Sequence, residues 1–162
     1  MTEQNNPFHK KKSGVFFFKS SNPYEFYDLL NGIDMEPKQD VWGTLIFPEN
    51  AKLPCPVIVP IHGSAGLREG HHTHMVNLLE AGFAVFRIHH FESRGVISIV
   101  ENQTQVTLAT MITDAFRALA LLNKHPDIDK NKIGIMGWSL GGSTALYAAW
   151  QPIIDALTSG DE

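Results

Sequence analysis

The sequence is poor in cysteine, has no long apolar segment and carries no excess of positive charge. Cys55 is the only cysteine in 162 residues, which excludes a disulfide bond within the chain. No segment approaches the roughly 20 apolar residues of a membrane-spanning helix, so we expect no membrane partner. The formal net charge is −4. Because phosphate binding requires a concentrated basic surface, we expect no nucleic-acid partner either.

The amino-terminal region resembles a secretory signal only superficially. Three lysines at residues 10–12 precede an apolar run at residues 15–18, and Lys19 ends this run. A signal peptide needs an apolar stretch of about 7–15 residues. We therefore predict a β-strand here and a cytoplasmic protein, with export expected instead if the natural start lies upstream. Residues 1–14 are polar, and we expect them to be loosely ordered.

The most informative segment reads Gly-Trp-Ser-Leu-Gly at residues 137–141. An apolar run precedes it and small residues follow it, which predicts a strand, a sharp turn and a helix. This context is typical of a nucleophile elbow. Ser139 is therefore the predicted catalytic nucleophile, and the backbone N–H of Leu140 the predicted donor to an oxyanion. The alternative interpretation is a glycine-rich turn with an incidental serine.

A second segment fits the same chemistry. Residues 57–61 form a continuous apolar run, typical of a buried parallel strand, and His-Gly-Ser-Ala-Gly follows at residues 62–66. A strand followed by such a loop supplies the second oxyanion donor, which we assign to the backbone N–H of Ser64. His62 is expected to brace this loop, with a role as catalytic base as the less favoured alternative.

Together these motifs resemble the α/β-hydrolase superfamily and, within it, the dienelactone hydrolase family. The similarity covers about residues 40–152 and includes the segments 94–96, 105–107, 125–129 and 132–142. It implies a three-layer α/β-hydrolase fold with a mostly parallel sheet. It also implies a small-molecule substrate whose ester or lactone bond is cleaved through a serine acyl-enzyme. Finally, it implies that Arg94 binds a substrate carboxylate; the alternative is a salt bridge with Glu92 or Glu101.

The sequence departs from the founding members of that family at two places. They carry cysteine at the nucleophile position, where this chain has Ser139, and glutamate in the first oxyanion loop, where it has Gly63. The loss of a carboxylate that is tied to thiol activation agrees with an alkoxide mechanism. Lactone chemistry is therefore not assigned above ester chemistry.

The expected general base is missing after the nucleophile. In α/β-hydrolases the order along the chain is serine, then aspartate or glutamate, then histidine, but all eight histidines of this chain precede Ser139. We therefore expect an amino-terminal fragment, truncated after the elbow helix, that is inactive by itself and self-associates through an open sheet edge. The alternative is a catalytically inactive α/β-hydrolase-fold protein that serves in binding or as a scaffold.

The histidines do not predict a metal site, and we expect no cofactor. Neither group of neighbouring histidines contains a pair four residues apart or a carboxylate at the spacing of a zinc protease; the groups are His71, His72 and His74, and His89 and His90. We expect them to serve in polar packing or to line a substrate pocket, with His89 or His90 as a less favoured base. Asp114 is expected to be structural.

Hydrophobic periodicity and turn residues predict the remaining organisation. The expected strands are residues 15–18, 40–47, 57–61, 83–88 and 132–137. The expected helices are residues 72–81, 104–123 and 140–150, with a short helix or loop at 24–30. We divide the chain into an amino-terminal extension with the first strand, residues 1–39, and a partial α/β-hydrolase domain, residues 40–162.

Overall fold

The computed structural model describes residues 13–159, so the expected loose ordering of residues 1–12 lies outside the described residues. Gly14 already opens the first strand. The elements are β1 (Gly14–Ser20), α1 (Phe26–Asn31), β2 (Gln39–Ile46), β3 (Cys55–Ile61), α2 (Glu69–Glu80), β4 (Ala84–Ile88), the 3-10 turn η2 (Glu92–Arg94), α3 (Leu108–Leu122), β5 (Ile128–Gly137), α4 (Leu140–Ala148) and α5 (Gln151–Thr158). All the strands predicted from the sequence are present, as are the three predicted helices and the helical form of residues 24–30.

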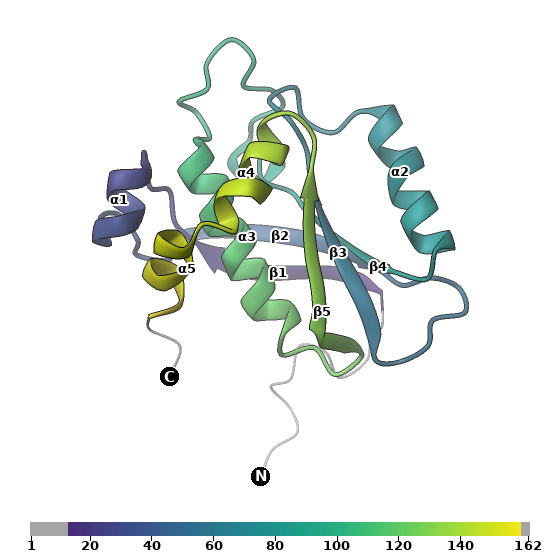
Figure 1. Cartoon of the computed structure of the whole chain (residues 1–162). Coiled ribbons are helices and arrows are strands. Elements are labelled where there is room, and N and C mark those ends of the chain that lie inside the picture. The colour runs from purple at the N-terminus through teal and green to yellow at the C-terminus, as the bar shows by residue number, and fades with distance from the viewer. Residues whose placement is uncertain (1–12, 160–162) are drawn as a thin grey trace.

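The strands form one sheet in the order β1-β2-β4-β3-β5. The central strand β3 pairs in parallel with β4 and with β5, whereas β2 is antiparallel to both of its neighbours. Four of the five strands, β1, β3, β4 and β5, therefore run in one direction, which confirms the mostly parallel sheet. The three parallel strands end at the same edge of the sheet, where open α/β sheets place their ligands (Figure 1).

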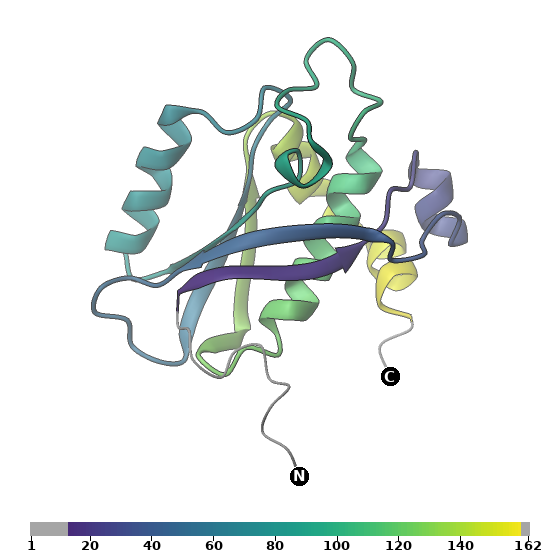
Figure 2. The same cartoon turned by 180° about the vertical axis from the view of Figure 1, so that it is seen from behind.

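The helices cover the sheet on both sides. On the β2–β4 pair, α3 packs with Leu45 and Phe86 in the main core, whereas α2 borders a cavity with Thr44 and Val85. Because successive residues of a strand point to opposite faces, α2 and α3 lie on opposite sides of the sheet (Figures 1 and 2). This arrangement confirms the predicted three layers of an α/β fold.

Helix boundaries differ from the prediction where capping decides them. Helix α3 begins at Leu108 rather than at residue 104, because the Thr107 hydroxyl accepts a hydrogen bond from the Thr110 N–H at 3.1 Å and caps the helix. Helix α5 is absent from the prediction. It begins after Trp150, which has an extended conformation, and carries proline in its first turn, a favoured position.

The predicted boundary between the two regions of the chain follows residue 39. Strand β1, which precedes this boundary, pairs with β2, most of which follows it. Helix α1 in turn contacts α5 and α3. The boundary itself stays a prediction. Among residues 13–159, no helix has the length and apolar character required to cross a membrane.

Strand β5 forms one edge of the sheet, since β3 is its only pairing partner among the described residues. Apolar side chains lie exposed on α4 and just after it: Leu146 is 71% exposed and Trp150 45% exposed. An unpaired edge beside exposed apolar side chains favours association.

We expect the chain to self-associate through the β5 edge and the adjoining helix α4. Replacing Leu146 with glutamate places a charge in the exposed apolar surface and should shift the protein toward monomer at tens of micromolar. Size-exclusion chromatography with light scattering measures this. The control is Phe17→Lys, since Phe17 is 70% exposed on the opposite edge strand, β1. A wild-type monomer, or equal effects of both variants, would contradict the expectation.

Candidate functional site

Ser139 lies at the sharp turn between β5 and α4, at the carboxyl end of the parallel strands. Its backbone angles are φ 54° and ψ −120°, a left-handed φ that is uncommon for a residue other than glycine. Such a conformation costs of order 1–3 kcal/mol and persists only where the surrounding structure fixes it. The residue is exposed, and although Ser139 occupies the N-cap position of α4, its side chain makes no capping hydrogen bond.

The two glycines of the motif allow the turn to pack closely. A Cβ atom on Gly137 would lie 2.1 Å from the carbonyl carbon of Gly141. A Cβ on Gly141 would lie 2.1 Å from the carbonyl oxygen of Ile61, the last residue of β3. Both contacts are with backbone atoms, which cannot rotate away. The spacing of glycines around Ser139 therefore follows from the close approach of α4 to β5 and β3.

The loop that follows β3 lies directly against the serine turn. A Cβ atom on Gly63 would lie 3.1 Å from the Ser139 Cβ and 3.6 Å from the Ser139 Oγ. The structure thus brings together the two segments that the sequence singled out separately, residues 62–66 and residues 137–141. The catalytic roles of Ser139, Ser64 and Leu140 stay predictions.

The orientation of the Gly63–Ser64 peptide is fixed from its carbonyl side. The Gly63 oxygen accepts hydrogen bonds from His62 Nδ1 at 2.9 Å and from the Gly66 N–H at 3.0 Å. Because a trans peptide is planar, the Ser64 N–H points in the opposite direction. On the other side of this residue, the Ser64 oxygen accepts the Ile99 N–H at 2.8 Å and the Ser98 hydroxyl at 3.3 Å.

His62 is buried and holds this loop in place. Burial and the neighbouring His90 lower the pKa of His62 to about 4, so the imidazole is neutral at pH 7. Because it bonds to a carbonyl oxygen, Nδ1 carries the proton. The ring packs edge-on against Phe91, with centroids 4.4 Å apart, and against His90 at 5.6 Å. These are the contacts of a loop brace.

Leu140 is the first residue of α4. An N–H in the first turn of a helix has no acceptor within that helix, and the helix dipole places partial positive charge there. The Leu140 N–H is therefore chemically suited to bind a developing negative charge.

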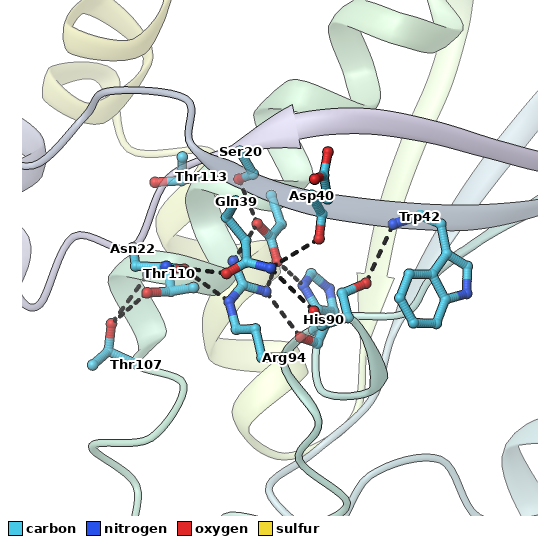
Figure 3. A network of polar contacts seen from close by, with 12 residues as sticks. Ser20, Asn22, Gln39, Asp40, Trp42, His90, Arg94, Thr107, Thr110 and Thr113 are labelled. Atoms are coloured by element: carbon cyan, nitrogen blue, oxygen red, sulfur yellow. Dashed lines mark hydrogen bonds and ion pairs between the residues drawn. The ribbon is translucent and has the colours of Figure 1, made fainter.

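Arg94 lies in a buried polar network rather than in the salt bridge that was the alternative to substrate binding. Its Nη1 and Nη2 atoms donate to both oxygens of Asp114 at 2.8 and 2.9 Å, and Nη1 also donates to the His90 carbonyl at 2.8 Å (Figure 3). The alternative interpretation, a salt bridge with Glu92 or Glu101, was wrong, since Arg94 pairs with Asp114 and Glu92 pairs with Arg87. Binding of a substrate carboxylate by Arg94 stays a prediction. The Arg94 side chain is only 7% exposed, so a substrate carboxylate would have to displace Asp114.

Asp114 is the centre of this network and is fully buried. Besides Arg94, it accepts hydrogen bonds from Ser20 Oγ at 2.5 Å and from His90 Nδ1 at 2.8 Å. Burial by itself would raise the pKa of Asp114, but the His90 hydrogen bond and the Arg94 charge outweigh burial and lower it. Its structural role was expected, whereas its partners could not be read from the sequence.

Three further histidines lie against tryptophan rings. His71 on α2 stacks on Trp138, with centroids 4.3 Å apart, and His74 lies against the same ring at 5.7 Å. His89 bonds to the Thr44 hydroxyl at 2.8 Å and stacks on Trp42. Within residues 13–159, no three side chains of the types that bind metals gather at one point.

Comparisons with known proteins identify the family of this chain. The family model BD-FAE matches residues 44–157, which is more than half of the chain. A comparison with curated proteins gave no match.

Several solved structures have a similar fold. The dienelactone hydrolase from Anabaena variabilis has a TM-score of 0.56 and 21% identity, covering 83% of this chain and 57% of its own. Est1E from Butyrivibrio proteoclasticus with ferulic acid bound has a TM-score of 0.55 and 25% identity, covering 68% and 43%. The glucuronoyl esterase from Solibacter usitatus has a TM-score of 0.53 and 18% identity, covering 90% and 50%.

The chain spans about half the length of the solved structures that it matches. Strands β3, β4 and β5, with the serine turn and the loop after β3, fall within the region of the family match, which begins near the end of β2. The chain therefore belongs to the BD-FAE family and has the α/β-hydrolase fold.

Proposed function

We propose that this chain carries the nucleophile and the oxyanion hole of a hydrolase that cleaves carboxylic esters or lactones. The observation that carries the proposal is the geometry of Ser139: an exposed serine in a left-handed conformation, with no capping hydrogen bond, packed against the Gly63 loop. A strained turn that presents a serine at the end of a parallel strand is the arrangement of a nucleophile elbow.

In the proposed reaction, the Ser139 oxygen attacks the carbonyl carbon of the ester or lactone. The N–H groups of Leu140 and Ser64 bind the oxyanion of the tetrahedral intermediate. Collapse of the intermediate breaks the bond to the alcohol oxygen, which leaves with a proton, and an acyl-enzyme remains on Ser139. Water then releases the acid and restores the hydroxyl.

A general base must take the Ser139 proton and return it to the leaving alcohol. We assign no residue of this chain to that role, because no histidine follows Ser139 in this sequence and His90, although its Nδ1 is bonded to Asp114, is fully buried. The names of the similar structures support the substrate class, since they are called dienelactone hydrolase and glucuronoyl esterase. Est1E holds ferulic acid, which favours esters of aromatic acids among the candidates.

A second candidate function is binding or scaffolding by a catalytically inactive member of the fold. The specific observation in its favour is that, among residues 13–159, no histidine is hydrogen-bonded to the Ser139 hydroxyl. The two functions differ in the reactivity of Ser139, because a preformed oxyanion hole accelerates acylation even without a base.

The test is labelling with a fluorophosphonate probe. Loss of a triad member typically leaves about 10³–10⁴-fold acceleration from the oxyanion hole and binding, so Ser139 should react much faster than other exposed serines. Mass spectrometry of the digested protein compares the Ser139 adduct with Ser98, an exposed serine of the same chain, and Ser139→Ala is the second control. Equal labelling of Ser139 and Ser98 would favour the binding or scaffold protein.

A further inference from the structure

Ser64, the proposed oxyanion donor, is held by contacts on both of its flanking carbonyl groups. The Gly63 oxygen is held by His62 and Gly66, and the Ser64 oxygen by Ile99 and Ser98. A Cβ on Gly66 would lie 2.7 Å from the Ile97 oxygen, so the segment that follows β4 also packs tightly against this loop. The position of the Ser64 N–H therefore depends on His62 and on residues 97–99.

Both supports lead back to Asp114. The His62 ring rests against His90, whose Nδ1 is bonded to Asp114 at 2.8 Å. The segment that follows β4 carries both His90 and Ile99. Arg94 donates a hydrogen bond to the His90 carbonyl oxygen and is itself held by Asp114. A fully buried carboxylate on α3 thus fixes two structures that meet at Ser64.

The network is anchored to other parts of the sheet as well. Ser20, at the end of β1, donates to Asp114, and Asn22 accepts the Arg94 Nε–H at 2.8 Å. Gln39 and Trp42 of β2 bond to Ser93, beside Arg94 (Figure 3). An ionised carboxylate that accepts several hydrogen bonds holds its donor side chains in fixed positions. Fixed positions are required if the network is to keep a peptide in one orientation.

We propose that Asp114 and Arg94 are positioning residues for the Ser64 N–H, acting through His90, His62 and residues 97–99. The proposal rests on the proposed function for the catalytic use of this N–H, but the positioning itself can be measured without catalysis. It gives Arg94 an indirect role, in place of contact with a substrate carboxylate.

The experiment compares Arg94→Met with Leu122→Ala. Leu122 is buried at the far end of α3, so its truncation destabilises the fold without touching the network. Two quantities are measured where both variants are folded: the position of the Ser64 amide peak in ¹H–¹⁵N NMR spectra, and the rate of fluorophosphonate labelling at Ser139. Removing one oxyanion donor outright costs about 10²–10³-fold in rate, so its displacement should cost about tenfold.

We expect Arg94→Met to move the Ser64 peak and to slow labelling by about tenfold, while Leu122→Ala leaves both unchanged. If Arg94→Met does not fold, Asp114→Asn, which conserves the size of the side chain, replaces it with the same expectation. An unmoved Ser64 peak in the folded variant, or equal changes in both variants, overturns the proposal. A moved Ser64 peak with no preferential labelling of wild-type Ser139 supports the positioning role and rejects the proposed function.

Discussion

Replacing Gly141 with alanine is expected to destabilise the protein by more than about 3 kcal/mol, the upper end of the usual cost of overpacking. The added Cβ would lie 2.1 Å from the Ile61 oxygen and 2.6 Å from the Ile61 carbonyl carbon. Because both are backbone atoms of β3, the helix and the strand would have to move apart. Urea unfolding followed by tryptophan fluorescence measures the loss in free energy of unfolding.

Gly142→Ala is the matched control. A Cβ at this position would lie 3.3 Å from the Gly137 oxygen, a contact that a small shift relieves. Alanine is favoured over glycine in a helix by about 1 kcal/mol, so this variant should be within about 1 kcal/mol of wild type. Similar losses for the two variants would mean that close packing of α4 on β3 is not what requires Gly141.

Removing the carboxylate of Asp114 is expected to cost about 3–5 kcal/mol. Asp114→Ala leaves the Arg94 guanidinium, 7% exposed, without its partner, and breaking a buried ion pair on one side carries a penalty of this size. The double variant Asp114→Leu with Arg94→Met should lose less stability than Asp114→Leu and Arg94→Met lose together when each is measured alone. Additive losses in urea unfolding would show that the two side chains are not energetically coupled.

The same pair predicts a pH dependence. The pKa of Asp114 is lowered in the folded state, so the folded protein binds fewer protons there than the unfolded chain, whose carboxyl titrates near 3.9. The stabilisation is therefore complete well above about pH 4 and is lost as pH falls through the folded pKa. Asp114→Asn should lack this contribution to the acid dependence of its stability.

Local pattern was sufficient to predict the serine turn. The glycines, Ser139, the preceding apolar run and the following small residues are contiguous, and together they predict a tight turn from strand to helix. The neighbouring loop was predicted for the same reason, since residues 62–66 directly follow the apolar run of β3. The catalytic roles assigned to these residues are still predictions.

The buried network lay beyond what the sequence could predict. Ser20 and Asp114 are 94 residues apart and His90 and Asp114 are 24 apart, so no local pattern links them. Arg94 has acidic residues nearby in sequence, and these suggested the wrong partner; the fold instead presents Asp114 from α3. Helix α5 was missed because eight residues give too short an amphipathic pattern.

The contact between Gly63 and the serine turn has an evolutionary consequence. A Cβ at position 63 would lie 3.1 Å from both the Ser139 Cβ and the Trp138 oxygen, so any larger residue there requires the turn to shift. Substitutions at position 63 and at positions 138–139 should therefore be accepted together among homologous sequences rather than independently. Covariation between these two loops, although they are about 75 residues apart in the chain, would be the inherited record of a single steric contact.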